Sequence, residues 1–164
     1  ANYALGWPAD TVNFKHPLDY VGFDGGGGVG SGPGMSVGTA LALKGSGRTV
    51  LSILGDGDFL MNGQELATAV DLGLPIAVVL WNNGGYGEIR DSMERADVPP
   101  VAVDTSARDF LRIAEGFGCR AVRVCVVVEN CLDTWAGDIG YEVSFDPVAP
   151  VVVGVFPIRP VTRS

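Results

Sequence analysis

Short apolar runs alternate with stretches in which apolar residues recur at helical spacing. Such runs lie at residues 49–54, 76–81 and 151–156, and each is nearly continuous in Val, Ile, Leu or Ala. Continuous short runs are typical of strands buried on both faces of a parallel sheet. A fourth strand is expected at 120–128 and a short one at 20–23. Helices are expected at 35–43, 62–72 with Asn62 as N-cap, and 106–117.

The alternation of strands and helices predicts a doubly wound α/β fold, with a mostly parallel sheet and helices on both faces. Ligands of such sheets bind beyond the carboxyl ends of the strands. Two loops, at residues 55–58 and 82–86, leave strands at that edge and carry polar side chains. The glycine-rich run at 25–34 is expected to be a loop. Residues 126–150 lack the helix expected before the last strand.

Composition and charge limit the possible partners. The chain has 164 residues, 47% of them hydrophobic, with a net charge of −8. We expect one domain over 1–164, no membrane span, and no affinity for nucleic acid or anionic membranes. An anionic ligand therefore needs a metal ion or backbone amides to hold it. Cys119, Cys125 and Cys131 match no disulfide or zinc pattern, which favours reduced thiols and a cytoplasmic location.

The two polar loops have the donors of a magnesium site. Neighbouring parallel strands lie about 4.8 Å apart, so Asp56 and Asn83 are expected to converge. Their side-chain oxygens and a backbone carbonyl near Gly85 form half a coordination shell for Mg²⁺, which a diphosphate and water complete. Gly57 and Asp58 precede a predicted helix, where free N–H groups favour phosphate. Either loop alone is more often an ordinary turn, and only their conjunction indicates a site.

Residues 51–90 begin with LSILGDGDF and end with WNNGGYGEIR. This run resembles the thiamine diphosphate motif of acetolactate synthases, benzoylformate decarboxylase and other 2-oxo-acid decarboxylases. The resemblance extends over about residues 19–124. It implies that the chain is the diphosphate-binding domain of such an enzyme, with thiamine diphosphate and Mg²⁺ as cofactors. The implied reaction is decarboxylation of a 2-oxo acid, followed by protonation to an aldehyde or ligation to a second carbonyl.

The resemblance also implies roles for individual residues. Asp56, Asn83 and the carbonyl of Gly85 would bind Mg²⁺, and Gly57 and Asp58 would contact the diphosphate. Val29 would support the bent shape of thiamine, and the carbonyl of Gly27 would accept from its amino group. Tyr86 and Ile89 would line the substrate pocket. The implied cofactor-binding set is Gly27, Val29, Asp56, Gly57, Asp58, Asn83, Gly85 and Tyr86.

The catalytic glutamate of these enzymes comes from a separate pyrimidine-binding domain, for which this chain is too short. Glu65 is expected to be structural, and Glu88 to be solvated or salt-bridged. No catalytic residue is therefore assigned here. The implied partners are a pyrimidine-binding domain or subunit that carries the glutamate and a 2-oxo-acid substrate. The complete enzyme would be a homodimer or homotetramer.

Three alternatives remain open. Residues 25–30 match G-x-G-x-x-G, but in so glycine-rich a window the match is trivial, and no acidic residue for a ribose follows about 20 residues on. A dinucleotide-binding oxidoreductase is thus disfavoured. The chain is otherwise a non-catalytic subunit or fragment that needs a partner domain, or a relic without cofactor, against which the intact Asp56 and Asn83 argue. The lone His16 is expected to be a surface residue.

Overall fold

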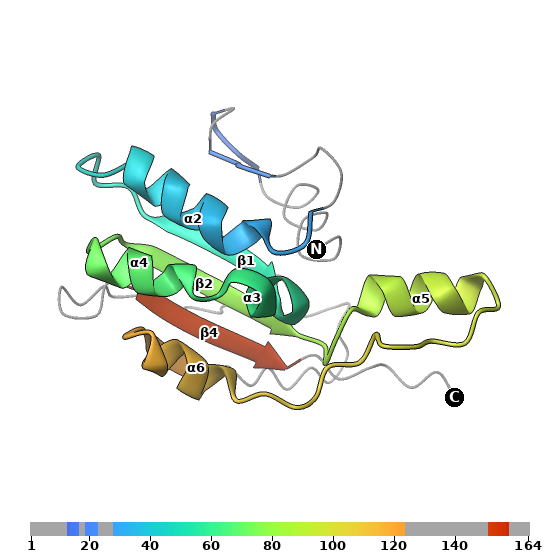
Figure 1. Cartoon of the computed structure of the whole chain (residues 1–164). Helices are drawn as coiled ribbons and strands as arrows, with labels where there is room; N and C mark the ends of the chain where they lie inside the picture. The colour runs from blue at the N-terminus through green and yellow to red at the C-terminus, as the bar shows by residue number, and fades with distance from the viewer. Residues whose placement is uncertain (1–12, 17–18, 23–27, 124–150, 158–164) are drawn as a thin grey trace, which may run out of the picture.

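A four-stranded parallel sheet forms the centre of the chain. The computed structural model describes residues 13–16, 19–22, 28–123 and 151–157 (Figure 1). The strands are β1 (Val50–Gly55), β2 (Ile76–Asn82), β3 (Arg120–Arg123) and β4 (Val151–Pro157). Their order in the sheet is β1-β2-β4-β3, and every pair is parallel. The parallel α/β fold predicted from the sequence is confirmed.

Four of the described helices pack against one face of this sheet. The helices are α2 (Ser31–Ala42), α3 (Asp56–Asn62), α4 (Glu65–Asp71), α5 (Gly87–Arg95) and α6 (Phe110–Gly116). In Figure 1, α2, α4 and α6 lie side by side across the sheet, while α5 projects away from it. One buried cluster joins residues of α2, α3, α4 and α6 to alternate positions of the strands. Helices on the other face stay a prediction, and residues 124–150, between β3 and β4, lie outside the described residues.

Alternation along β1 shows which face of the sheet the helices cover. Ser52 and Leu54 are buried beneath the helices, whereas Leu51, which points to the opposite face, is 63% exposed. Ser52 also shares a 2.6 Å hydrogen bond with Ser36 of α2, so that the two buried hydroxyl groups satisfy each other. Phe59 is buried in the cluster, and Trp81 is half-buried.

Helix α2 begins earlier than the sequence predicted. The expected loop at 25–34 and helix at 35–43 are wrong at their boundary, because α2 starts at Ser31. Pro33 lies in the first helical turn, where its missing N–H group has no intrahelical partner to lose. Glycine and proline in a first turn therefore gave the misleading pattern of a loop.

The predicted helix at 62–72 is two shorter helices. Helix α3 runs from Asp56 to Asn62, and α4 starts at Glu65 after a break at Gly63 and Gln64. Asn62 is thus the last residue of α3 and not an N-cap. The acidic side chains of Asp56 and Asp58 lie in the first turn of α3, where the helix dipole favours negative charge.

The other boundaries differ in smaller ways. Residues 20–22 form no strand, and α6 begins at 110 rather than 106, with the Asp109 side chain accepting from the Arg112 N–H. Helix α5 was not predicted, because its sequence is mostly polar, with Ile89 and Met93 as its only apolar side chains, and Gly87 is its only buried residue. Beyond 123, the expected strand at 120–128 and the segment 126–150 lie outside the described residues.

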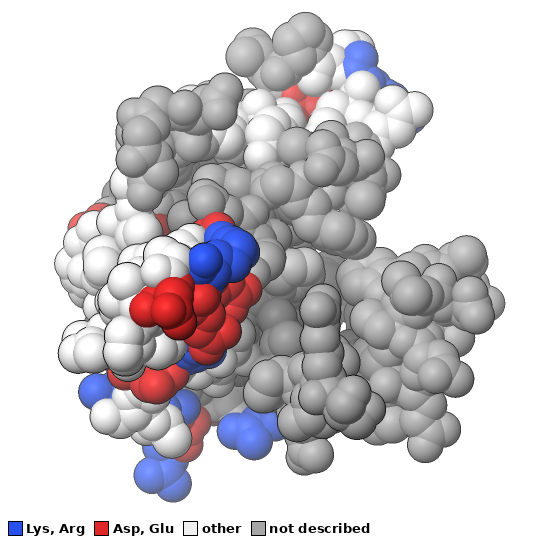
Figure 2. All heavy atoms as spheres, turned by 90° about the vertical axis from the view of Figure 1, so that its right-hand side faces the viewer, with Lys and Arg blue, Asp and Glu red and all other residues white. Residues whose placement is uncertain are grey.

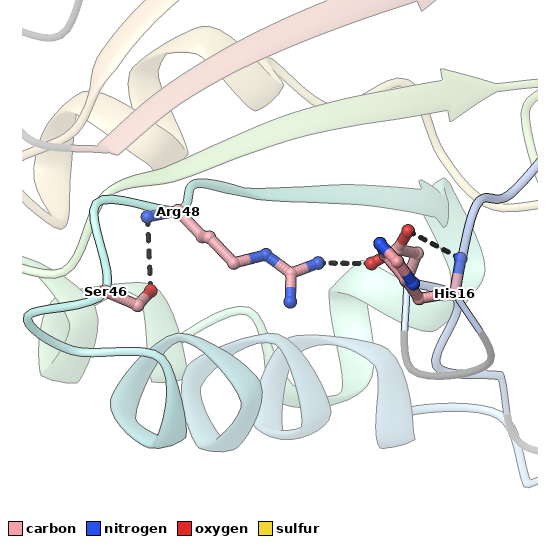
Figure 3. Close-up of polar contacts among 4 residues, drawn as sticks. His16, Ser46 and Arg48 are labelled. Atoms are coloured by element: carbon pink, nitrogen blue, oxygen red, sulfur yellow. Dashed lines mark hydrogen bonds and ion pairs between the residues drawn. The ribbon is translucent and has the colours of Figure 1, made fainter.

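An ion pair ties the segment around Asp19 to the beginning of β1. The Asp19 carboxylate accepts from the Arg48 guanidinium at 2.6 Å and from the backbone N–H of His16 at 3.0 Å (Figure 3). The Arg48 N–H in turn donates to Ser46 Oγ at 3.2 Å. His16 is exposed, as predicted, and it is the backbone N–H of His16, not its ring, that donates to Asp19.

The face from which α5 projects shows acidic and basic side chains close together (Figure 2). Glu88 and Arg95 of α5 are paired at 3.2 Å. The signs are mixed and no continuous basic surface is visible on this face. Among the described residues, no helix has the length and apolar character needed to cross a membrane.

The different burial of two helical leucines predicts different effects of their truncation on the free energy of unfolding. Leu66 of α4 is fully buried, whereas Leu41 of α2 is 50% exposed. We expect Leu66→Ala to lower the free energy of unfolding by about 2–5 kcal/mol, because it removes buried methyl groups and leaves a cavity. Leu41→Ala should change it by about 0.5 kcal/mol at most. Urea unfolding of both variants measures this, and equal losses would contradict the described packing.

Candidate functional site

The loops that follow β1 and β2 lie together at one edge of the sheet. The two strands pair in parallel with Gly55 opposite Trp81. Asp56 and Asn83, which come directly after the strands, therefore leave the sheet at the same edge, where α3 begins (Figure 1). The sequence predicted that these loops meet, and they do.

Oxygen atoms of three residues converge between the loops. The side-chain oxygen of Asn83 lies close to two acceptors, 2.7 Å from the Gly85 carbonyl oxygen and 3.0 Å from Asp56 Oδ1. The N–H of Gly85 donates to the same Asn83 oxygen at 3.3 Å. Oxygen atoms this close repel one another unless a cation lies among them, or unless the amide turns so that its NH₂ donates to both.

This spacing fits a hard divalent cation. When Mg²⁺ binds oxygens octahedrally at about 2.1 Å, neighbouring ligand oxygens lie about 3.0 Å apart. Carboxylate, amide and carbonyl oxygens are also the donor types that Mg²⁺ prefers. The described residues contain no group of three or more His, Cys, Asp and Glu side chains arranged for a metal. The remaining ligands would therefore be water and an anionic ligand, the pattern usual for protein-bound Mg²⁺.

The Asp56 carboxylate is buried without full compensation. The residue is 2% exposed, and its Oδ2 atom has no hydrogen-bond partner. Burial raises the pKa of Asp56 above its ordinary value of 3.8, and nearby backbone N–H groups, chiefly those of Gly57 and Gly85, offset the shift in part. An unpartnered buried oxygen of an acidic side chain is the group that a bound cation would satisfy.

A strap formed by residues 103–105 holds the second loop in place. The Tyr86 N–H donates to the Val103 carbonyl at 2.8 Å, and the Thr105 N–H donates to the Gly84 carbonyl at 3.0 Å. Gly85 lies between these bonds with φ of +153°, and a Cβ there would collide with the Val103 carbonyl oxygen. Only glycine fits this position, so the strap fixes where the Gly85 carbonyl points.

The strap is also joined to α5. The Arg90 guanidinium forms an ion pair with Asp104, the middle residue of the strap. The Asp104 side chain is largely exposed although it is paired. Since exposed pairs contribute little stability, the backbone hydrogen bonds are the main support of the Gly85 loop.

Tyr86 closes the gap between the two loops. A Cβ on Gly57 would lie 2.8 Å from the Tyr86 ring, so the ring packs directly on the glycine backbone. Glu88 forms an ion pair with Arg95, which is one of the two states predicted for it. The Ile89 side chain is half-exposed on α5. The Tyr86 ring thus borders the oxygen cluster, while Glu88 is engaged elsewhere.

The glycine-rich loop before α2 contacts the other side of α3. The Gly30 N–H donates to Asp58 Oδ1 at 2.5 Å, and the Asn62 amide donates to the Gly30 carbonyl at 2.8 Å. The Asp58 side chain therefore already has a hydrogen-bond partner, and its backbone N–H is the group that remains for the predicted contact with the diphosphate. Val29 is half-buried in this loop. Gly27 lies outside the described residues.

The sequence did not indicate several of these supporting residues. The strap at 103–105 and Arg90 carry no motif, and nothing in the sequence links them to Gly85. Asp58 and Asn62 are four residues apart, the spacing of one helix face. That signal was present, but it is recognisable only once α3 is known to begin at Asp56.

Cys119, the described cysteine, is a packing residue. It is buried, and burial raises the pKa of its thiol to about 11, so the thiol stays protonated and unreactive near neutral pH. Cys125 and Cys131 lie outside the described residues.

Comparison with known proteins identifies the class to which this fold and site belong. The family described as "Thiamine pyrophosphate enzyme, C-terminal TPP binding domain" matches residues 3–136. The chain therefore belongs to this family, whose cofactor is thiamine diphosphate, as the sequence predicted. The dinucleotide-binding alternative has no support from this match.

Individual relatives agree with this assignment. A probable 2-ketoarginine decarboxylase of Pseudomonas aeruginosa is 43% identical over 123 residues, which is 74% of this chain and 20% of the relative. An acetolactate synthase of Mycobacterium bovis is 33% identical over 133 residues, which is 77% of this chain and 21% of the relative. The chain thus spans about a fifth of the length of the curated relatives it matches.

A solved structure shares the fold. Benzoylformate decarboxylase from Polynucleobacter necessarius superposes with a TM-score of 0.61 and 24% identity, covering 80% of this chain and 24% of that one. At this identity the likeness supports the fold alone. The parallel sheet with its helices is thus a fold already known among thiamine diphosphate decarboxylases.

Burial of Asp56 has a consequence for stability in the metal-free chain. The folded state binds the Asp56 proton more tightly than the unfolded state does. The free energy of unfolding therefore falls as pH rises from about 3.8 to the raised pKa of Asp56, and this loss persists at higher pH. We therefore expect Asp56→Asn, in EDTA at pH 7, to be more stable than the parent, with a difference that shrinks on acidification. Urea midpoints across this pH range measure the effect.

The exposed Asp71 provides the control, since Asp71→Asn should leave the profile unchanged. An Asp56→Asn variant less stable than the parent at pH 7 in EDTA would mean that the carboxylate is fully compensated without metal.

A second expectation concerns Gly85. Gly85→Ala should break the strap, because the new methyl group meets the Val103 carbonyl, and amide hydrogen exchange at Tyr86 and Thr105 should accelerate. Gly84→Ala is the matched control: its φ is +78° but a Cβ there meets no atom within 4 Å. It should cost about 1–2 kcal/mol of backbone strain and leave the strap closed. Equal exchange in both variants would contradict the role of the close approach.

Proposed function

We propose that this chain binds the diphosphate of thiamine diphosphate through Mg²⁺ held by Asp56, the side-chain oxygen of Asn83 and the carbonyl of Gly85. The observation that carries the proposal is the buried, unpartnered Oδ2 of Asp56, beside an Asn83 amide whose terminal atom lies 3.0 Å from Asp56 Oδ1 and 2.7 Å from the Gly85 carbonyl oxygen. A bound cation compensates the buried carboxylate and removes the repulsion among the oxygens.

The diphosphate completes this arrangement. With a net charge of −8, the chain holds an anion only through local devices, and the cation is the strongest of them. Backbone N–H groups of Gly57 and Asp58, in the first turn of α3, are suited to donate hydrogen bonds to a phosphate oxygen. The Tyr86 ring covers Gly57 and would exclude water from one side of the bound group.

The substrate we propose is a 2-oxo acid. The named substrates of two similar proteins, 2-ketoarginine and benzoylformate, are both 2-oxo acids. When bound, thiamine diphosphate supplies the carbon atom that adds to the keto group and allows CO₂ to leave. The residues of this chain hold and orient that cofactor and restrict its contact with water. Tyr86 and Ile89 are proposed to border the substrate.

The catalytic glutamate is proposed to come from a pyrimidine-binding domain or subunit. Glu88 is paired with Arg95, and Glu65 begins α4 beyond α3, so neither lies free beside the oxygen cluster. The chain's length, a fifth of its relatives, agrees with a requirement for further domains. We propose that the complete enzyme is a homodimer or homotetramer, with the site between the two kinds of domain.

Calorimetric titration of thiamine diphosphate into the chain, with Mg²⁺ and again with EDTA, tests the proposal. We expect weak binding that requires Mg²⁺, since part of the pocket belongs to another domain. Asp56→Ala should weaken binding about a hundredfold or more, about 2.8 kcal/mol, because it removes a charged ligand of the cation. The fold should stay intact, as judged by circular dichroism.

Asp71→Ala serves as the matched control, because Asp71 is an exposed aspartate at the end of α4. It should bind like the parent. If Asp56→Ala binds as tightly as the parent, the assignment of the metal ligands is wrong. If the parent binds equally well in EDTA, the diphosphate is held without a cation.

A further inference from the structure

Helix α3 joins the oxygen cluster to the glycine-rich loop. Asp56 in its first turn contributes to the cluster, while Asp58 and Asn62 turn toward Gly30. Because the seven residues of α3 span only about 10 Å, both contacts lie close to the proposed cation. A ligand anchored at the Asp56 end, and larger than a diphosphate, has this loop as its neighbouring wall.

Gly30 is held by both of its backbone polar groups. Its N–H donates to Asp58 Oδ1 at 2.5 Å and its carbonyl accepts from Asn62 Nδ2 at 2.8 Å. Gly30 is the N-cap of α2, with φ of +97°, and having no side chain it caps nothing itself. Asp58 thus accepts from the N–H of the N-cap residue, as the glutamate of a capping box does from within its own helix.

Asp58 is a buried residue, and its side chain accepts a hydrogen bond from the Gly30 N–H. It is 7% exposed, and its second carboxylate oxygen lies against the Gly32 backbone in the first turn of α2. A carboxylate there is favoured by the positive end of the α2 dipole. Any side chain on Gly32 would collide with it, so the close approach of α3 and α2 depends on this pair of residues.

We propose that Asp58 and Asn62 are positioning residues that fix the backbone of residues 28–30, and so preform the wall against which the thiamine part of the cofactor binds. This inference rests on the proposed function. It assigns the two side chains a task distinct from that of Asp56: they act on the organic part of the ligand, through the loop that carries Val29, and not on the diphosphate. When Asp58 and Asn62 no longer hold the loop, ordering the loop on binding costs part of the binding free energy.

Two ligands separate these tasks. Inorganic pyrophosphate with Mg²⁺ probes the cation site alone, and thiamine diphosphate with Mg²⁺ probes both parts. We expect Asn62→Ala to weaken binding of thiamine diphosphate about tenfold, the loss of one or two hydrogen bonds, and to leave pyrophosphate binding within about twofold. Asp58→Asn keeps an oxygen acceptor for the Gly30 N–H and should retain most of the affinity, whereas Asp58→Ala should not.

Matched controls make the comparison specific. Asn13→Ala removes an exposed asparagine and should change neither affinity. Asp56→Ala should lose both ligands. Amide hydrogen exchange in the ligand-free chain should show faster exchange at Gly30 and Ser31 in Asn62→Ala, with α4 unchanged, which separates a loosened loop from a damaged fold.

The outcomes are distinguishable. Equal weakening of both ligands, or no weakening of either, overturns the positioning role while leaving the proposed function standing. A parent that binds pyrophosphate but not thiamine diphosphate also overturns it, because the loop then forms no wall. A parent that binds neither ligand with Mg²⁺ contradicts the proposed function itself. If Asp58→Ala fails to fold, Asn62→Ala alone decides.

Discussion

The cost of burying one carboxylate is the constraint on which the site depends. Asp56 is almost fully enclosed, and one of its oxygens has no partner. An ionised carboxylate in such a place is stable only when a cation or several hydrogen bonds compensate it. The Gly85 N–H offsets part of this cost, and the Asn83 amide adds a donor when its NH₂ group faces Asp56 and an oxygen ligand for a cation when it is turned the other way. Stability of the metal-free chain and affinity for the cation are therefore opposed at the same atoms.

The sheet brings the two loops together, but it does not fix their atoms. Parallel pairing of β1 and β2 sets the loops to within a strand spacing, whereas metal coordination requires a few tenths of an ångström. The finer placement comes from backbone contacts: the strap at 103–105 on Gly85, and the side chains of α3 on Gly30. Because these contacts bind backbone groups, they hold the loops whatever the loop side chains do.

Strands β1, β2 and β4 were predictable, because continuous apolar runs indicate buried strands, and their boundaries agree with the predicted ones within one residue. The short strand expected at 20–23 was wrong, since residues 20–22 form none. The helices were less predictable from the sequence. Helix α3 was missed at its start because Gly55, Asp56 and Gly57 are common in turns, although acidic residues also favour a first helical turn. Helix α5 was missed because it is short and mostly polar, and its two apolar side chains, Ile89 and Met93, are too few to give a clear periodic signal.

The sequence by itself determined the parallel α/β fold, the edge of the sheet at which the loops of Asp56 and Asn83 meet, and the residue types that these loops carry, because the alternation of strands and helices can be read from local pattern. Only the tertiary structure decided what each oxygen faces. It directs the Asp58 side chain to Gly30, and it brings Val103, 18 residues beyond Gly85, against the Gly85 loop. Such contacts join residues that are distant along the chain, and no local pattern encodes a pairing that arises only when the helices and strands have packed.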